Sequence, residues 1–300
     1  MSLPSQIRLW EAGPRDGLQN EKSVVPTDVK VELIERLVEC GATYIEATSF
    51  VSPKWVPQMG DAADVMTRIS RKPGVTYQVL TPNEKGYDSA KQYGARAIAV
   101  FAAASESFSQ RNVNCSIEES LERFRPVVQK AKADGVRVRG FVSVVLGCPF
   151  EGEVDPVKVA GIAKRLAEMG CDDIGLGDTI GTGTPGKTKR LIEETAKFIP
   201  LDRIGMHFHD TYGQALANTY ASLEMGITSH DASVAGLGGC PYAPGATGNL
   251  ATEDLVYMLE GLGIDSGFDL KQLVRTAWWI SEKLGRPPVS SVAKALKSKI

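Results

Sequence analysis

Two histidines lie two positions apart in the sequence, and their spacing is typical of a metal site. His207 and His209 fall in a β-type run, and residues i and i+2 of a strand point to the same side of a sheet. Asp16, in the loop GPRDG, could add a carboxylate. Two imidazoles and one carboxylate suit a catalytic divalent ion better than a closed structural zinc. The alternative is a pair of solvated or hydrogen-bonded histidines. The third histidine, His230, has no such partner and is expected to be structural.

A second group of polar residues lies at the ends of other β-type runs. Glu46 sits inside an apolar run, where its carboxylate is expected to pair with Arg15 of the GPRDG loop. A desolvated pair would hold the guanidinium rigid, and a rigid guanidinium is a good electrophile for a carbonyl or enolate oxygen. The simpler interpretation is a structural ion pair. The sequence leaves two roles open for Asp178, in LGDTIG: it could cap the following turn or take part in proton transfer.

Cysteine supplies the remaining candidate chemistry. Cys240 lies in GLGGCP, whose glycines and proline exclude a regular helix or strand, so a turned loop presents the thiol as acid, base or nucleophile. Cys148, in LGCPFEG, is the second candidate thiol. Asn249, in the same long loop as Cys240, offers a neutral oxygen toward a metal or substrate. The other cysteines are expected to be small apolar fillers near element ends: Cys40, Cys115 and Cys171.

Eight β-type runs alternate with helix-period segments and must position these residues. They cover residues 7–10, 44–47, 76–80, 97–101, 136–145, 173–177, 204–208 and 230–234. This spacing predicts βα units with a parallel sheet, and eight units in ~250 residues is the size of a TIM (β/α)8 barrel. The alternative is a doubly wound open sheet. We expect one domain over residues 1–300, with additional C-terminal helices from about 266.

Helix starts and one misleading motif can also be identified. Ser116 with Glu119 forms a capping-box pattern, while Asp155 and Thr184 each precede a proline that suits a first helical turn. GTGTPG at residues 181–186 matches a dinucleotide-binding fingerprint, but its proline and the lack of an acidic residue about twenty positions later argue against nicotinamide binding.

Composition excludes several classes of protein. The 300 residues are 43% apolar and 23% charged, with a net charge of −2, which excludes disorder and gives no field that would concentrate nucleic acid or anionic lipid. The longest apolar run, residues 97–104, is too short to cross a bilayer. Five cysteines without CxxC spacing argue against a disulfide framework, and residues 1–6 do not resemble a presequence, so we expect a cytoplasmic protein.

The motifs resemble those of the 3-hydroxy-3-methylglutaryl-CoA lyase family over nearly the whole chain. The matching stretches are GPRDGLQNEK from residue 13, TSFVSPKWVPQMGD from 48, NCSIEES from 114, LGDTIG from 176 and HDTYGQALANT from 209. The most specific is SVAGLGGCPY at residues 233–242, which looks like the signature around the catalytic cysteine of that family. More distant metal-dependent aldol and Claisen barrels share only the Arg-Asp loop and the HxH.

The resemblance implies a role for each candidate. It implies that a Mg²⁺ or Mn²⁺ ion is held by four residues: Asp16, His207, His209 and Asn249. Arg15 would contact the substrate carbonyl and stabilise the enolate, Glu46 would support that site, and Asp178 would lie at the catalytic face. Cys240 would be the catalytic thiol. Phe208 departs from the small residue that related animal enzymes tend to have between the histidines.

The implied reaction cleaves 3-hydroxy-3-methylglutaryl-CoA to acetoacetate and acetyl-CoA, in a leucine-degradation or ketone-body type pathway. The general base is open between a metal-bound hydroxide, His207 and Asp178. The first alternative is a related aldol or Claisen enzyme with another acyl substrate, such as a synthase that condenses acetyl-CoA with a 2-oxo acid. A non-haem iron oxygenase and an inert binding scaffold are further alternatives.

The partners follow from the same resemblance. The substrate is a small acyl-CoA molecule, with no nucleic acid and no membrane, and a homodimer is expected. Three cations could hold the CoA phosphates, and the sequence does not distinguish between them: Lys22, Lys54 and Arg111.

Overall fold

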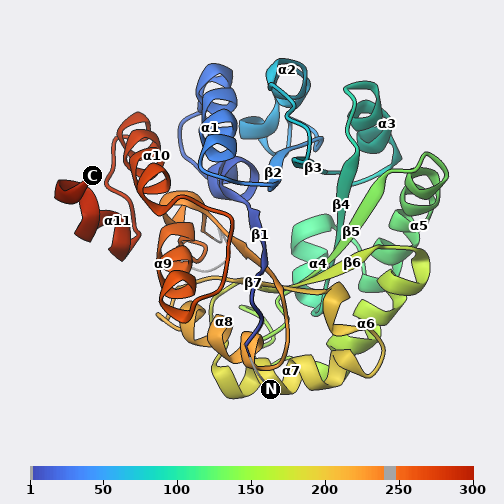
Figure 1. Cartoon of the computed structure of the whole chain (residues 1–300). Helices are drawn as coiled ribbons and strands as arrows, with labels where there is room; N and C mark the ends of the chain where they lie inside the picture. The colour runs from blue at the N-terminus through green and yellow to red at the C-terminus, as the bar shows by residue number, and fades with distance from the viewer. Residues whose placement is uncertain (1–2, 240–247) are drawn as a thin grey trace.

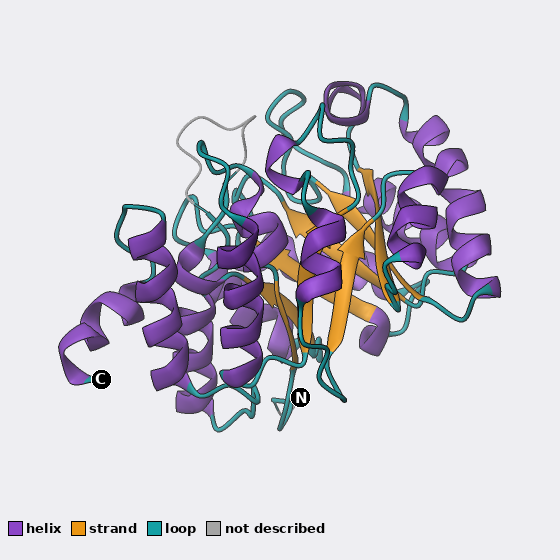
Figure 2. Cartoon of the chain, turned by 90° about the horizontal axis from the view of Figure 1, so that it is seen from above, coloured by secondary structure: helices purple, strands orange, loops and turns teal. Residues whose placement is uncertain are grey.

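The described residues form a closed barrel of eight parallel strands, surrounded by helices (Figures 1 and 2). The computed structural model describes residues 3–239 and 248–300. The strands pair in chain order, and β1 closes the barrel against β8. They are β1 (Arg8–Glu11), β2 (Tyr44–Ser49), β3 (Thr76–Leu80), β4 (Ala97–Ala103), β5 (Arg137–Ser143), β6 (Asp173–Asp178), β7 (Ile204–Phe208) and β8 (Ser229–Ala232).

The TIM-barrel prediction is confirmed, and the open-sheet alternative is excluded by the β1–β8 pairing. Every predicted strand overlaps an observed one, with ends that differ by up to two residues. The apolar runs are recognisable because strands of a parallel barrel are covered on both faces. In β4, for example, Ile98 and Val100 face one side of the sheet and Ala97 and Ala99 face the other, and all four are buried.

Helices follow each strand and cover the outside of the barrel. They are α1 (Thr27–Glu39), α2 (Ala62–Arg68), α3 (Glu84–Gln92), α4 (Glu106–Val113), α5 (Ile117–Ala133), α6 (Pro156–Met169), α7 (Pro185–Ala196), α8 (Ala215–Glu224), α9 (Thr252–Leu262), α10 (Leu270–Lys283) and α11 (Ser291–Leu296). In the part of the chain that the structure describes, none of these helices is long and apolar enough to span a membrane.

Two of the three predicted helix caps form. Ser116 and Glu119 make the complete capping box of α5, and the Asp155 side chain accepts a hydrogen bond from the backbone N–H of Val157 in α6. Thr184 occupies the N-cap position of α7, but its side chain makes no capping bond. That part of the prediction is wrong, and Pro185 alone marks the start of the helix, because its fixed φ suits a first turn.

The predicted C-terminal helices are α10 and α11. Figure 1 places α10 between α9 and α1, so α10 completes the ring of helices beside the first barrel unit. The approach is close: Asp269 donates its backbone N–H to the Cys40 carbonyl at 2.8 Å, and a Cβ on Gly41 would lie 2.0 Å from the Gly267 carbonyl oxygen. Gly41 also has a φ of 103°, so it is required there on both counts.

Candidate active site

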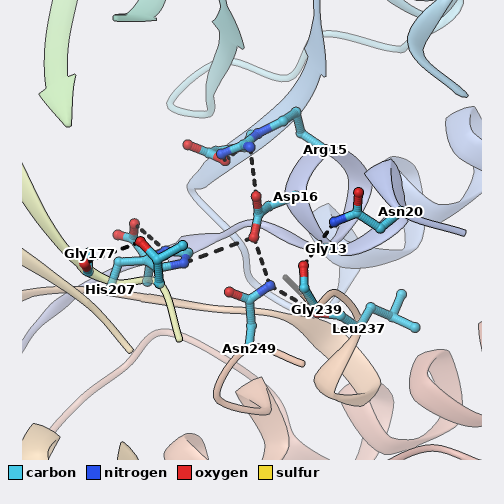
Figure 3. Close-up of polar contacts among 12 residues, drawn as sticks. Gly13, Arg15, Asp16, Asn20, Gly177, His207, Leu237, Gly239 and Asn249 are labelled. Carbon is cyan, nitrogen blue, oxygen red and sulfur yellow. Dashed lines mark hydrogen bonds and ion pairs between the residues drawn. The ribbon is translucent and has the colours of Figure 1, made fainter. Parts of the chain in front are cut away.

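Asp16 lies at the centre of a polar cluster at the carboxyl ends of the strands (Figure 3). It sits in a π-helical turn, Gly13–Gly17, that follows β1 directly. Its carboxylate accepts hydrogen bonds from Arg15 Nη1 at 2.7 Å and from Asn249 Nδ2 at 2.9 Å, and it lies 3.9 Å from His207 Nε2. Three segments that are far apart in the sequence therefore meet at one carboxylate, on the face where barrel enzymes hold their sites.

Two glycines let the turn after β1 approach the segment after β8. A Cβ on Gly13 would lie 2.7 Å from Glu11 Oε1 and 2.9 Å from a methyl carbon of Val234. A Cβ on Gly17 would lie 2.8 Å from both Leu237 Cβ and Ser233 Oγ. These distances are shorter than side chains tolerate, so the glycines of GPRDG are explained by close packing of the Asp16 turn.

His207 and His209 point to the same side of the sheet, as their spacing predicts. Their ring centroids are 5.3 Å apart, and the ligand atoms of both histidines and of Asp16 all lie within 4.8 Å of one another. Burial acts to raise the pKa of Asp16, but the nearby Arg15 and the two histidines outweigh it and hold that pKa well below the usual range. Burial, together with the neighbouring His207, lowers the pKa of His209 to about 4. His209 is therefore neutral at pH 7, the form that binds metals.

A short segment after residue 247 brings Asn249 to the histidines. Leu250 donates its N–H to the Phe208 carbonyl at 3.0 Å, which extends the end of β7 and places Asn249 against His209. Among the residues that the structure describes, Asn249 Oδ1 and His209 Nδ1 are buried without a hydrogen-bond partner. Buried polar atoms are nearly always satisfied, so two orphans beside a carboxylate fit a cation that these side chains would hold.

Arg15 is fixed by Glu46, the pair predicted from the sequence. Arg15 Nε donates to Glu46 Oε2 at 2.9 Å, and Nη2 reaches the same oxygen. The second oxygen of Glu46 accepts a hydrogen bond from Gln78 Nε2 at 2.9 Å. Gln78 was not identified from the sequence, where the only indication of its role is that a polar residue interrupts an apolar strand. Both members of the ion pair are buried, which leaves Arg15 Nη1 directed at Asp16.

Asp178 caps the turn that follows β6, one of its two expected roles. Its Oδ2 accepts from the Gly183 N–H at 2.9 Å, and its Oδ1 accepts from the Thr182 N–H at 3.2 Å. Burial raises its pKa to about 6, although these backbone donors act to lower it. The turn also carries the GxGxxG pattern. Two backbone amides of this turn therefore donate to the Asp178 carboxylate.

The predicted thiol, Cys240, lies outside the described residues. Its described neighbour Gly239 accepts a hydrogen bond from Asn20 Nδ2 at 2.8 Å (Figure 3). The second candidate, Cys148, is buried and donates to Ser105 Oγ at 3.0 Å. The remaining cysteines are buried fillers, as predicted: Cys40, Cys115 and Cys171.

The third histidine and the three candidate phosphate ligands are not part of this cluster. His230 is buried against α8, where its Nε2 is 2.8 Å from Ser222 Oγ, so the structural interpretation is confirmed. Lys22, Lys54 and Arg111 are exposed in segments that follow β1, β2 and β4. These segments follow the carboxyl ends of their strands, the side of the barrel that carries Asp16.

Two buried glutamates that the sequence analysis did not identify join β1 to the start of α9. Glu11 accepts hydrogen bonds from the N–H groups of Gly13 and Val234 and from Thr252 Oγ1, at 2.7–2.9 Å. Glu253 accepts one from the Ala235 N–H at 2.8 Å. Burial raises the pKa of Glu11 to about 7 and that of Glu253 to about 8. Between about pH 4.5 and these raised values, the folded protein therefore holds protons on both carboxyls that the unfolded chain releases.

This difference predicts a dependence of stability on pH. The folded-state pKa of Glu253 lies above its unfolded value, so the stabilisation is present below about pH 4.5 and is lost as the pH rises through about 8. We expect the thermal midpoint of the native protein to fall across this range. The thermal midpoint of Glu253→Gln, whose side chain cannot ionise, should fall less. Thermal unfolding at a series of pH values measures both, with the exposed Glu260→Gln on the same helix as control. Parallel curves for the native protein and Glu253→Gln would refute the assignment.

The fold and the cluster together are those of a barrel enzyme with a candidate divalent-metal site. Comparison with known proteins specifies the class. The model of the HMGL-like family matches residues 6–280. The chain is 56% identical over 294 residues to the mitochondrial hydroxymethylglutaryl-CoA lyase of Bos taurus, covering 98% of this chain and 90% of that protein.

A bacterial relative matches over its full length. The chain is 56% identical over 299 residues to the 3-hydroxy-3-isohexenylglutaryl-CoA/hydroxy-methylglutaryl-CoA lyase of Pseudomonas aeruginosa, covering all of both proteins. The crystal structure of hydroxymethylglutaryl-CoA lyase from Pseudomonas aeruginosa superposes with a TM-score of 0.98 at 56% identity, covering both chains completely. This chain belongs to the HMGL-like family.

Proposed function

We propose that this protein is a carbon–carbon lyase that cleaves 3-hydroxy-3-methylglutaryl-CoA to acetoacetate and acetyl-CoA. Its membership of the HMGL-like family supports the substrate. The observation that carries the chemistry is the contact between Asp16 and Arg15, at 2.7 Å, which joins the candidate metal cluster to a buried, immobilised guanidinium. In the proposed reaction a tertiary alcohol loses its proton and a neighbouring thioester receives the electrons. The metal cluster would serve the alcohol, and the guanidinium beside it would serve the thioester.

Four side chains would hold the divalent ion: Asp16, His207, His209 and Asn249. Oxygen and imidazole donors of this kind accept Mg²⁺ or Mn²⁺, which we propose as the ion. When bound, the ion supplies a Lewis acid that lowers the cost of the substrate alkoxide. Asp16 is ionised and His209 neutral, so both are in the protonation state that binding requires.

Arg15 is proposed to meet the negative charge that develops on the thioester carbonyl as the bond breaks. The Glu46 carboxylate holds Nε and Nη2, so the guanidinium does not have to reorganise when the enolate forms. Such preorganised donors in a water-poor site stabilise a transition state more than the ground state. Glu46 is thus proposed as a positioning residue, and Gln78 holds its second oxygen.

Protons are transferred at two points of the proposed reaction, from the substrate hydroxyl and to the enolate carbon. The hydroxyl proton of the substrate would be taken by His207 or by Asp178. Asp178 has a pKa of about 6, which suits a group that exchanges protons near neutral pH, although both its oxygens bind the 182–183 amides. Cys240 is proposed as the acid that protonates the enolate carbon to acetyl-CoA. Support comes from its described neighbour Gly239, held beside the Asp16 turn by Asn20.

Loss of the Cys240 thiol is therefore expected to slow turnover without affecting the metal. Cys240→Ser should lower kcat by about 10²-fold or more, the usual range for a lost general acid, while Mn²⁺ affinity stays near that of the native protein. Cys148→Ser is the matched control and should retain activity, since that thiol is engaged by Ser105. Steady-state kinetics and Mn²⁺ binding measure both. A Cys240→Ser rate close to the native rate would remove the thiol from the mechanism.

The remaining proposals concern the substrate's outer part and the assembly. We propose that exposed cations above the strand ends contact the CoA phosphates, with Lys22, Lys54 and Arg111 as candidates. Arg111 packs over the Phe150 ring at 4.4 Å, which gives it a defined position. We also propose one domain per chain and a homodimer.

A product assay tests the proposed function. Purified protein is incubated with 3-hydroxy-3-methylglutaryl-CoA, Mg²⁺ and a thiol reductant, and acetoacetate and acetyl-CoA are measured. We expect the two products to form in equal amounts. Parallel reactions use 3-hydroxy-3-isohexenylglutaryl-CoA, because one relative carries that name. Cleavage of the methyl substrate supports the proposal. Cleavage of the isohexenyl compound alone would show the same chemistry with another acyl specificity, and no cleavage of either would refute the function.

A further inference from the structure

A buried aspartate inside the barrel lies behind one of the two histidines. Asp231 on β8 is directly opposite His207 on β7 in the strand register. Its Oδ2 lies 3.2 Å from His207 Nδ1, and the Asp231 side chain is completely buried. The other ring nitrogen of His207, Nε2, faces Asp16 at 3.9 Å. His207 therefore bridges a carboxylate in the barrel interior and the carboxylate of the candidate metal cluster.

The second oxygen of Asp231 is fixed from the opposite side of the barrel. Arg139 on β5 donates from Nη2 to Asp231 Oδ1 at 2.7 Å, and both side chains are fully buried. The guanidinium is held in turn by two aromatic rings, with its Cζ 4.8 Å from the Trp10 centroid and 4.5 Å from that of Phe141. Its Nε also faces Asp173 at 3.5 Å. Asp231 thus has no freedom to turn away from His207.

The two histidines differ in this respect. Among the described residues, His209 Nδ1 has no hydrogen-bond partner, whereas His207 Nδ1 has Asp231. A carboxylate at Nδ1 requires a proton on that nitrogen, so it selects the tautomer whose Nε2 lone pair is free. Metal-binding histidines are commonly oriented in this way, and loss of the outer partner lowers metal affinity.

We propose that Asp231 is a positioning residue that fixes the tautomer and orientation of His207, so that Nε2 is presented to the metal ion. Arg139 is the anchor that keeps the Asp231 carboxylate aligned in the barrel interior. The inference rests on the metal site proposed above, and it assigns a function to the interior charges that the cleavage reaction itself does not use.

Two variants separate positioning from the loss of a buried charge. Asp231→Asn keeps the size of the side chain but removes the carboxylate that accepts from His207. Asp173→Asn removes a carboxylate that also faces Arg139, at 3.5 Å, and that makes no hydrogen bond to His207. We expect Asp231→Asn to weaken Mn²⁺ binding by about 10- to 100-fold, and Asp173→Asn to bind close to the native protein. Circular dichroism establishes that each variant is folded before the titration.

The tautomer is measured on the native protein, so that the test does not depend on a variant. Long-range ¹H–¹⁵N spectra of the Mg²⁺-loaded protein should show His207 protonated at Nδ1 and unprotonated at Nε2. The opposite assignment would overturn the proposal. So would native Mn²⁺ affinity in folded Asp231→Asn, or equal weakening in both variants. If the native protein binds no Mn²⁺, the proposed metal site fails together with this inference. If it binds and Asp231→Asn binds equally well, only the inference fails.

Discussion

Arg15→Met is expected to abolish cleavage of 3-hydroxy-3-methylglutaryl-CoA while the metal site remains. Glu46 holds the Arg15 guanidinium in place, where we propose that it meets the negative charge developing on the enolate. Loss of a single preorganised donor of this kind typically lowers kcat by about 10²–10³-fold. We expect at least that loss, with Mn²⁺ affinity reduced far less, because Arg15 contacts Asp16 but is not among the proposed metal ligands.

A second substitution separates catalysis from stability. Arg15→Met leaves the Glu46 carboxylate buried without its partner, and breaking a buried ion pair costs about 3–5 kcal/mol. The double variant Arg15→Met/Glu46→Gln removes that charge. It should recover thermal stability but not turnover. Kinetics, Mn²⁺ binding and thermal unfolding of the three proteins distinguish the two effects. A single variant that turns over at the native rate would eliminate Arg15 from the chemistry.

His209→Ala is expected to remove both metal binding and activity. Of the four proposed ligands, His209 is the one whose substitution is easiest to interpret, since it is buried, has a pKa of about 4 and makes no hydrogen bond through Nδ1 among the described residues. Its loss should therefore disturb the fold little. Asp16 would be a poorer choice, because its substitution also breaks the contact with Arg15. We expect turnover to fall by roughly 10³-fold or more, corresponding to the several kcal/mol that a Lewis acid supplies.

The third histidine provides the control for this variant. His230 is equally buried but contacts Ser222 on the helix-facing side of β8. His230→Asn should keep stoichiometric Mn²⁺ binding and activity, whatever it does to stability. Calorimetric titration with Mn²⁺ and the product assay measure both variants. Undiminished Mn²⁺ binding by His209→Ala would contradict the ligand assignment.

The sequence predicted the barrel well because its signals are local. Apolar runs such as residues 97–101, covered on both faces, stand out without any knowledge of the fold, and the Ser116–Glu119 capping box is readable within four residues. The candidate site was predictable in part for the same reason. Strand order puts all carboxyl ends on one face, so Asp16, Glu46 and the two histidines could be placed together before their distances were known.

The residues that were missed depend on register and on contacts across the barrel. Asp231 lies in the short strand β8, whose sequence SHDA does not single it out, and only the pairing of β7 with β8 sets it opposite His207. Arg139 reaches it from β5, 92 residues earlier in the chain. Glu11 and Glu253 are linked through the segment after β8, because each accepts a hydrogen bond from a backbone N–H group of that segment. No periodicity encodes such contacts, because they are formed only when the barrel closes.

One measurement tests the central claim that a single metal ion at the Asp16–His207–His209–Asn249 cluster drives cleavage. Protein stripped with a chelator is titrated with Mn²⁺, while bound Mn²⁺ and the rate of acetoacetate formation from 3-hydroxy-3-methylglutaryl-CoA are followed together. We predict that the stripped protein is inactive, and that binding and rate rise in parallel to one ion per chain. Full activity in the stripped protein, or a rate that does not follow occupancy, would contradict the account.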